Sequence, residues 1–202
     1  MYGEVKFRHG AGTIPWKSSW PRLVIWSLLV LLLAYLAPRA YLTIRFAGTA
    51  HEPSSSSDFS DAASFLAKPD SSVSVVLSGL SHNYFDSETF MLEVWMKPIS
   101  LRHGYPFRRK ARKVSDEFSA ILVDVFSEAS SIEPYRGPKL CGGFHADFFA
   151  EFRSSARRSR VLVCFGCGEA LLFSGSESRI VDLSDKAFDR LDTAWREQEE
   201  AF

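Results

Sequence analysis

The chain has 202 residues, of which 46% are hydrophobic and 24% charged, and its 24 Lys and Arg residues balance 24 Asp and Glu residues. This average composition excludes a collagen-like chain, a wholly disordered chain and a protein with many membrane spans. Three cysteines are too few for a disulfide scaffold, and a net charge of zero gives no sign of nucleic-acid binding.

The first expected element is an apolar helix at residues 22–45, which follows a basic flank at residues 1–21. Residues 23–37 contain no charge, and the run lengthens if Arg22 and Arg39 direct their charges toward opposite membrane interfaces. A core helix of a soluble domain needs a polar side, whereas this run is apolar on every side. The pattern therefore predicts one transmembrane helix.

The same segment also has features of a cleaved signal peptide, because residues 48–50 are small and basic residues precede the apolar run. Arg39 and Arg45 separate that position from the run, which favours an uncleaved, single-pass signal-anchor. Four Lys and Arg residues precede the run and two follow it. This difference predicts an N-terminus inside and a C-terminal domain outside the cytoplasm.

The rest of the chain divides into a tether and a domain. Residues 46–72 are rich in Ser, Asp, Ala and Pro and are expected to form a tether that cannot bury enough apolar surface to fold. Residues 73–202 carry the signals of a small domain. Apolar residues alternate with others at residues 73–77 and 90–97, which predicts a half-buried strand in each segment.

A helix is expected to begin at Ser115, an N-cap residue followed by two acidic residues, because apolar side chains recur at helical spacing up to Ala129. Strands are also predicted at residues 144–152 and 179–183, with one or two more within residues 160–173, and Ser184 caps a closing helix. The predicted fold is therefore α+β. It is an antiparallel meander sheet of about five strands with two amphipathic helices, preceded by one transmembrane helix.

The cysteines and one histidine form a candidate metal site. If a turn at residues 154–159 pairs Phe152 with Val161, His145 falls beside the CFGC motif. Glycines around the motif allow the chain to bend so that both of its sulfur atoms face one point. The sequence therefore predicts a zinc site whose four ligands are Cys141, His145, Cys164 and Cys167.

Two alternatives remain open for these residues. Cys164 and Cys167 could form a redox-active pair, although such pairs usually open a helix and this motif lies among strand-like residues. They could also pack in the sheet or form a plain disulfide, with His145 hydrogen-bonded beside them. Asp147 lies on the same strand face as His145 and could orient it as a base, but the sequence identifies no nucleophile for it.

Several short motifs occur in a fixed order in the second half of the chain. His103–Tyr105 reads HGY, a helix follows, and Cys141 and His145 precede the CFGC motif at Cys164–Cys167. This order resembles an uncharacterised family of small bacterial proteins, many of them associated with the membrane or envelope. The resemblance covers Arg102–Leu183 and implies a shared domain, but no activity.

A cluster of basic residues precedes the first predicted helix of the domain and is a candidate for contact with lipid headgroups. Its members are Arg108, Arg109, Lys110, Arg112 and Lys113. More arginines crowd the hairpin tip at residues 153–160. A position outside the cytoplasm argues against nucleic acid as the partner. We therefore expect a membrane-anchored domain with a structural role or an unknown protein partner. The alternative is a thiol-disulfide or metal-dependent enzyme that acts through the CFGC motif.

Overall fold

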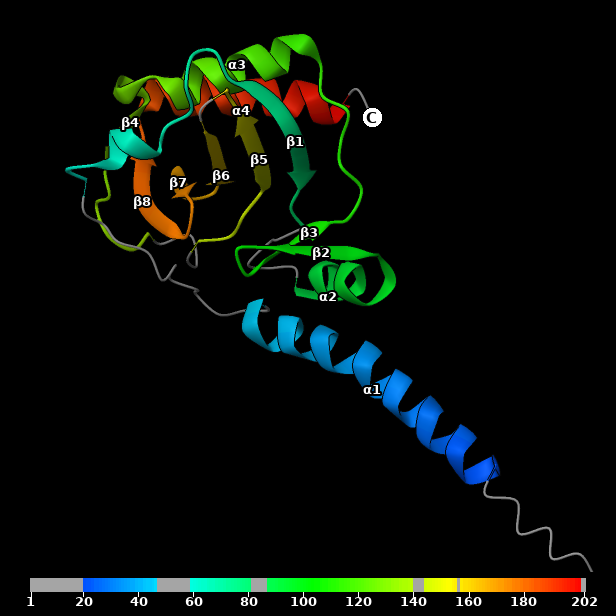
Figure 1. Ribbon diagram of the computed structural model, residues 1–202. Coiled ribbons are helices and arrows are strands. Elements are labelled where there is room, and N and C mark those ends of the chain that lie inside the picture. The colour runs from blue at the N-terminus through cyan, green and yellow to red at the C-terminus, as the bar shows by residue number, and fades with distance from the viewer. Residues whose placement is uncertain (1–19, 47–58, 81–86, 140–143, 156, 201–202) are drawn as a thin grey trace, which may run out of the picture. The chain divides into compact units, whose positions relative to one another are not determined.

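The computed structural model describes residues 20–46, 59–80, 87–139, 144–155 and 157–200 (Figure 1). The chain divides into two compact units, Met1–Pro38 and Arg39–Phe202. The second unit combines helices with an antiparallel sheet, so the predicted α+β class is confirmed. The boundaries predicted for the basic flank, the apolar segment, the tether and the domain stay predictions.

Helix α1 (Trp20–Phe46) contains the apolar segment. Its portion Arg22–Leu42 has a mean hydropathy of 2.0 over 21 residues, which at 1.5 Å per residue is about 31 Å, the thickness of a bilayer's hydrocarbon core. Among the described residues, this is the one helix long and apolar enough to cross a membrane. At its C-terminal end, Leu42 is buried and belongs to a core cluster of the domain.

A six-stranded sheet forms the centre of the domain, with the spatial order β1-β5-β6-β7-β8-β4. Every neighbouring pair is antiparallel, and β5 to β8 follow one another as the predicted meander. The sheet has one strand more than expected because residues 160–173 contribute two strands and short β4 extends the edge, whereas residues 90–97 contribute none. The strands are β1 (Ser72–Ser78), β4 (Ile132–Pro134), β5 (Phe148–Arg153), β6 (Arg158–Cys164), β7 (Glu169–Ser174) and β8 (Glu177–Leu183).

Two amphipathic helices, α3 (Asp116–Ser127) and α4 (Asp185–Glu200), lie side by side over one face of this sheet (Figure 1). Both were predicted, because apolar side chains at helical spacing require a surface to cover them. Leu122 and Leu191 are fully buried, and both belong to the core cluster that includes inward-facing strand residues such as Val163. This cluster is the first core of the domain.

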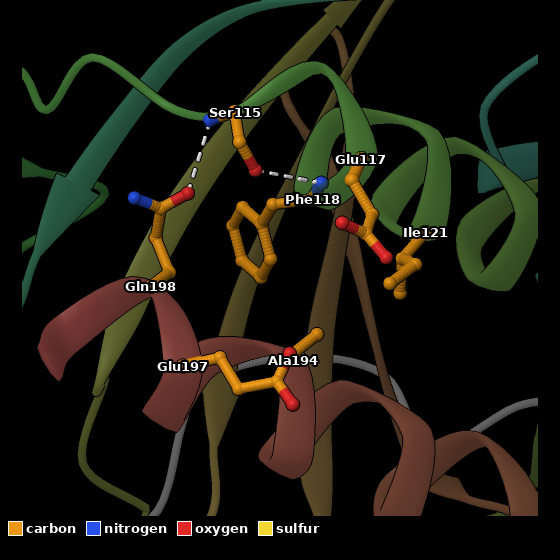
Figure 2. Close-up of a pocket in the computed structure, with 7 residues that line it drawn as sticks. All are labelled: Ser115, Glu117, Phe118, Ile121, Ala194, Glu197 and Gln198. Atoms are coloured by element: carbon orange, nitrogen blue, oxygen red, sulfur yellow. Dashed lines mark hydrogen bonds between the residues drawn. The ribbon is translucent and has the colours of Figure 1, made fainter. Parts of the chain in front are cut away.

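The start of α3 is hydrogen-bonded to the end of α4 (Figure 2). The Ser115 hydroxyl accepts a hydrogen bond from the Phe118 backbone N–H at 3.0 Å, so Ser115 is the expected N-cap. The Ser115 backbone N–H donates to Gln198 Oε1, also at 3.0 Å. Gln198 is buried, and a hollow of about 200 Å³ lies between the two helix ends. The bond from Ser115 to Gln198 ties the last turn of α4 to the start of α3.

The opposite face of the sheet is covered by a hairpin and a further helix, and together they form the second core. The covering elements are β2 (Ile99–Arg102), β3 (Tyr105–Arg108) and α2 (Ser87–Met96). Phe107 in the hairpin is fully buried and shares this core with Phe149 on the sheet. Both faces of the central strands are therefore buried, which explains why their apolar residues run almost without interruption.

The strand predicted at residues 90–97 is wrong, because most of these residues belong to helix α2. In a strand, Phe90, Leu92 and Val94 would share one face and be buried together. The structure instead buries Phe90 and Val94, which are four residues apart, and leaves Leu92 63% exposed. This is helical spacing. The segment is apolar at most positions, so its alternation fitted both periods and could not distinguish them.

Part of the segment predicted as a tether packs against the first core. A short 3-10 helix, η1 (Ala62–Phe65), buries the Phe65 ring, and a second, η2 (Ala129–Ser131), follows α3. Asp61 just before η1 accepts two hydrogen bonds from Arg179 of β8, at 2.9 and 2.8 Å. Residues 59–67 therefore contribute to the fold, whereas residues 47–58 lie outside the described part of the chain.

Candidate cysteine and histidine site

The CFGC motif forms a tight turn between two strands. Strand β6 ends at Cys164, β7 begins at Glu169, and these two residues are paired across the turn. Gly168 has a φ of 65°, a conformation that favours glycine, and its carbonyl accepts a hydrogen bond from Leu183. The bend expected at the glycines is thus a hairpin turn, and it places Cys167 on the same side as Cys164.

The pairing of β5 with β6 differs from the predicted register by two residues. Phe152 is opposite Ser159, not Val161. Strand β5 also begins at Phe148, so His145 precedes it in an irregular segment. Continuing the observed register places His145 opposite Gly166, where an added Cβ would come within 3.0 Å of the imidazole. The predicted closeness of His145 to the motif therefore holds despite the shift.

Three of the four predicted ligands lie together. His145 Nδ1 is 3.4 Å from Cys164 Sγ, and one donor atom each from His145, Cys164 and Cys167 lies within 4.8 Å of the others. Cys164 is fully buried, and the other two are partly buried. The fourth predicted ligand, Cys141, lies outside the described residues.

Asp147 contacts the histidine ring at Nε2. Its Oδ1 atom is 3.3 Å from His145 Nε2, and its Oδ2 atom accepts a hydrogen bond of 2.6 Å from the Phe165 backbone N–H. The backbone of Asp147 is also held on both sides, because its N–H donates to Val163 and its carbonyl accepts from Gly79, both at 2.7 Å. The imidazole therefore contacts both the Asp147 carboxylate and the Cys164 sulfur, which lies 3.4 Å from Nδ1 and 4.0 Å from Nε2, and we call these three side chains the row.

This row strongly favours a charged histidine. Burial by itself disfavours the imidazolium, but the hydrogen bonds that it donates to Asp147 and Cys164, together with electrostatic attraction to both groups, raise the pKa of His145 from 6.5 to about 10. The imidazole therefore carries a positive charge at neutral pH. A cation is stable at this point between the carboxylate and the sulfur.

The two cysteines of the motif differ in oxidation state. Cys164 is a free thiol, whereas Cys167 is disulfide-bonded. A plain disulfide between Cys164 and Cys167, one of the alternatives, is therefore excluded in this structure. Cys167 also lines a surface hollow of about 320 Å³, together with Lys139 and Asp182, which form an ion pair of 2.8 Å. Cys167 thus faces the surface and Cys164 the interior.

The candidate lipid-contact residues do not share one environment. Arg108 donates to the buried Glu93 at 2.9 Å, and the Arg112 guanidinium lies over the Trp195 ring at 5.4 Å. The remaining three are exposed: Arg109, Lys110 and Lys113. Arg108 and Arg112 thus make contacts within the domain, and these contacts account for their positions without a lipid headgroup.

Sequence reasoning did not identify the row as a unit. It placed Asp147 beside His145 but found no nucleophile for the pair, because Cys164 was considered only together with Cys167, as a metal ligand, a redox-active cysteine or a packed or disulfide-bonded residue. The signal was present: with the register corrected by two residues, Asp147 falls opposite Cys164. Comparison with protein-family models, curated proteins and solved structures finds no match to this chain. The resemblance to small bacterial envelope proteins therefore stays a prediction.

Proposed function

We propose that this chain is a single-pass membrane protein in which α1 anchors the α+β domain. The apolar segment Arg22–Leu42 has the length of a bilayer core, and side chains such as Leu23 and Leu33 are each 62% exposed. A lipid environment would remove this apolar surface from water. Leu42 ends the segment and is itself buried in the second core. The domain thus begins where the proposed span ends.

The role that we propose for the domain is structural or in binding, with a zinc ion at the cysteine and histidine cluster. The observation that carries this proposal is the grouping of His145, Cys164 and Cys167 within 4.8 Å. Around a tetrahedral zinc ion, such ligand atoms lie about 3.5–3.8 Å apart. The 3.4 Å between His145 Nδ1 and Cys164 Sγ is close to this spacing.

The surroundings of the cluster also suit a metal. Two sulfur atoms and one imidazole form a soft donor set that selects zinc over calcium or magnesium. Nδ1 of His145 is the ring nitrogen nearer to Cys164 Sγ, at 3.4 Å against 4.0 Å for Nε2. Nε2 lies 3.3 Å from the Asp147 carboxylate, and a carboxylate is the usual outer partner of a metal-bound histidine. His145, Cys164 and Cys167 would hold the ion, and the ion would crosslink β6 and the segment before β5.

Zinc binding requires the thiolate of Cys167 and therefore a reduced chain, because a disulfide sulfur is not a thiolate ligand. It also requires the neutral imidazole of His145, so zinc must displace the proton that the ring holds in the absence of a metal. The disulfide form and the zinc form of the cluster exclude each other. Disulfides persist outside the cytoplasm and are reduced within it. The side of the membrane on which the domain lies would thus decide which form is populated.

A second candidate function is thiol-disulfide exchange, which the free Cys164 thiol beside the oxidised Cys167 favours. The Cys164 thiolate, paired with the His145 imidazolium, would attack the Cys167 sulfur. A Cys164–Cys167 disulfide would form, and the former partner of Cys167 would leave as a thiolate with the electron pair of the broken bond. The number of disulfides is unchanged, so the step needs no oxidant. Because Cys164 is fully buried, this exchange would be internal to the chain.

Metal analysis and thiol counting on the full chain in detergent test these proposals. After reduction and incubation with zinc, we expect about one zinc ion per chain, and Cys164→Ser should abolish this binding. A matched control is Ser159→Ala, at a buried position of the same strand, which should keep the ion. A reduced wild-type chain without zinc would exclude the metal site. Mapping of disulfides in the oxidised chain would reveal exchange as a population joined between Cys164 and Cys167.

The membrane proposal has its own test. A tag at the C-terminus, combined with protease treatment of intact and opened cells, reports both cleavage of the N-terminal segment and the side on which the domain lies. A full-length chain that sediments with membranes after a carbonate wash supports the anchor. A shortened chain in the soluble fraction would show that the segment is a cleaved signal sequence.

A further inference from the structure

A pocket rich in arginine lies on the side of the sheet that carries the second core, away from the cysteine and histidine cluster. It is a hollow of about 420 Å³ between the β2–β3 turn and strands β5 and β6. Four arginines line it, together with one histidine and one glutamate; in chain order these are Arg102, His103, Glu151, Arg153, Arg158 and Arg160. The pocket thus brings together residues of the β2–β3 hairpin and of β5 and β6, which lie far apart in the sequence.

The pocket has a large excess of positive charge. Glu151 is the one acidic residue among those lining it, against four guanidinium groups. This positive charge affects the histidine in the pocket: burial and the charges of Arg160 and Arg102 lower the pKa of His103. His103 is therefore neutral at pH 7 and does not add to the positive charge. An anion that entered the pocket would meet uncompensated positive charge on several sides.

Glu151 holds three of the arginines in place without neutralising them. Its carboxylate accepts hydrogen bonds from Nε of Arg153 at 3.0 Å and Nε of Arg160 at 3.1 Å, and Nε of Arg158 lies 3.7 Å away. A guanidinium has five N–H donors. The Nη groups of Arg158 and Arg160 have no hydrogen-bond partner among the described residues and can donate to a ligand. Arg153 and Arg160 are thus hydrogen-bonded in position before a ligand arrives, which lowers the entropic cost of binding.

The fourth arginine enters from the hairpin turn. Its guanidinium lies over the Phe149 ring at 5.8 Å, and no ion pair holds Arg102 among the described residues. The turn next to it is unusual, because His103 has a φ of 50° and Gly104 a φ of 86°, as in a type I′ turn. The His103 ring stacks on Phe173 at 3.7 Å. Stacking fixes a non-glycine residue in a left-handed conformation at the mouth of the pocket.

We propose that this arginine pocket binds a phosphate group. Planar guanidinium groups donate pairs of parallel hydrogen bonds to phosphate oxygens, and several of them converging on one hollow suit a doubly charged anion. The phosphate can belong to a free phosphorylated metabolite or to the headgroup of an anionic lipid. The lipid source rests on the membrane anchor proposed above, whereas binding of free phosphate does not.

Titration of inorganic phosphate into the full chain in an uncharged detergent tests the pocket. Calorimetry measures affinity, and the NMR resonances of the His103 ring report occupancy. We expect saturable binding, with an upward shift of the His103 pKa. The variant Arg102→Gln should weaken affinity by about tenfold or more, because a charged hydrogen-bond donor is lost. Its side chain is exposed, so folding should be retained. The matched control, Arg190→Gln on α4, pairs with Asp124 and should leave affinity unchanged.

Reconstitution distinguishes the two sources of phosphate. In nanodiscs of phosphatidylcholine alone, a free-phosphate pocket should bind inorganic phosphate as in detergent. In nanodiscs that contain phosphatidylglycerol, a headgroup in the pocket should shift the His103 resonances without added phosphate, and Arg102→Gln should remove that shift. Absence of both responses would overturn the proposal, as would an equal loss of affinity in the Arg102 and Arg190 variants. The zinc and topology experiments do not depend on these results.

Discussion

The carboxylate of Asp147 lies beside the imidazole of His145, with 3.3 Å between Oδ1 and Nε2, and the Cys164 sulfur lies 3.4 Å from Nδ1 of the same ring. The same carboxylate accepts a 2.6 Å hydrogen bond from the Phe165 backbone N–H at the start of the CFGC turn. One side chain therefore positions both the imidazole and the turn. This explains how an irregular segment before β5 keeps a defined geometry beside the cysteines.

Replacing Asp147 should destabilise the domain in proportion to the interactions lost. We expect Asp147→Ala to lower the free energy of unfolding by about 2–3 kcal/mol, because Phe165 N–H and His145 both lose a partner in a partly buried site. Asp147→Asn keeps an oxygen for Phe165 and should cost less. Denaturant unfolding measures both variants, and equal losses would show that the turn contact contributes nothing.

The burial of Leu42 predicts that the end of α1 is part of the domain. Leu42 is 1% exposed and Ile44, two residues on, is 77% exposed. Leu42→Ala should therefore destabilise the domain by about 2–5 kcal/mol, as for other buried leucines. The matched Ile44→Ala should change stability by less than about 0.5 kcal/mol. Thermal unfolding in detergent gives the comparison, and similar midpoints for the two variants would contradict this packing.

Glu151 should make the domain sensitive to acid. Burial alone would raise its pKa, but hydrogen bonds from Arg160, Arg153 and Ser74 outweigh this and lower the pKa below the ordinary 4.5. Since the folded-state pKa is the lower one, the stabilisation is complete above about pH 4.5 and is lost as the pH falls through the folded-state value.

Measuring the free energy of unfolding between pH 7 and pH 3 checks the direction of this pH dependence. Glu151→Gln should lower the free energy of unfolding at pH 7, and this free energy should then decrease less toward pH 3 than it does in the wild-type chain. The control is Glu177→Gln, whose side chain is 69% exposed and 3.9 Å from its arginine partner. A flat wild-type profile, or the same change in both variants, would show that Glu151 is not the group that titrates.

The connection between Ser115 and Gln198 predicts coupling between α3 and α4. Ser115→Ala should cost about 1 kcal/mol through loss of the N-cap. Gln198→Ala should cost about 1–3 kcal/mol, because it leaves the Ser115 N–H without its acceptor. An additional change, Ser130→Ala at an exposed position, serves as a control. Chemical denaturation of the single variants and the double variant gives the coupling energy, and strict additivity would show that the two bonds act independently.

Much of the local structure could be predicted from the sequence. Helices α3 and α4 follow from apolar side chains at helical spacing and from the caps Ser115 and Ser184, all within a few neighbouring residues. The strand at Ser72–Ser78 follows in the same way from alternation. Helix α2 did not, because an almost continuous apolar segment satisfies both periods and only its burial in the second core distinguishes them.

The candidate site was predictable in part. His145 and the CFGC motif had to be neighbours in any hairpin with a turn near residues 154–159, and a two-residue error in register left that neighbourhood intact. The same error concealed the row of Asp147, His145 and Cys164, because side chains meet only at one register. The arginine pocket could not be predicted from the sequence, because Arg102 belongs to a hairpin that was not predicted.

By itself, the sequence determined the α+β class, the apolar N-terminal helix and the grouping of Cys164 and Cys167 with His145. These are properties of contiguous residues, or of one hairpin, and local periodicity encodes them. Only the tertiary structure decided that Cys164 is buried against His145 while Cys167 faces a surface hollow, and that Arg102 joins the arginines of β5 and β6. Such contacts depend on strand register and on which element covers each face of the sheet, and neither is a property of any single segment.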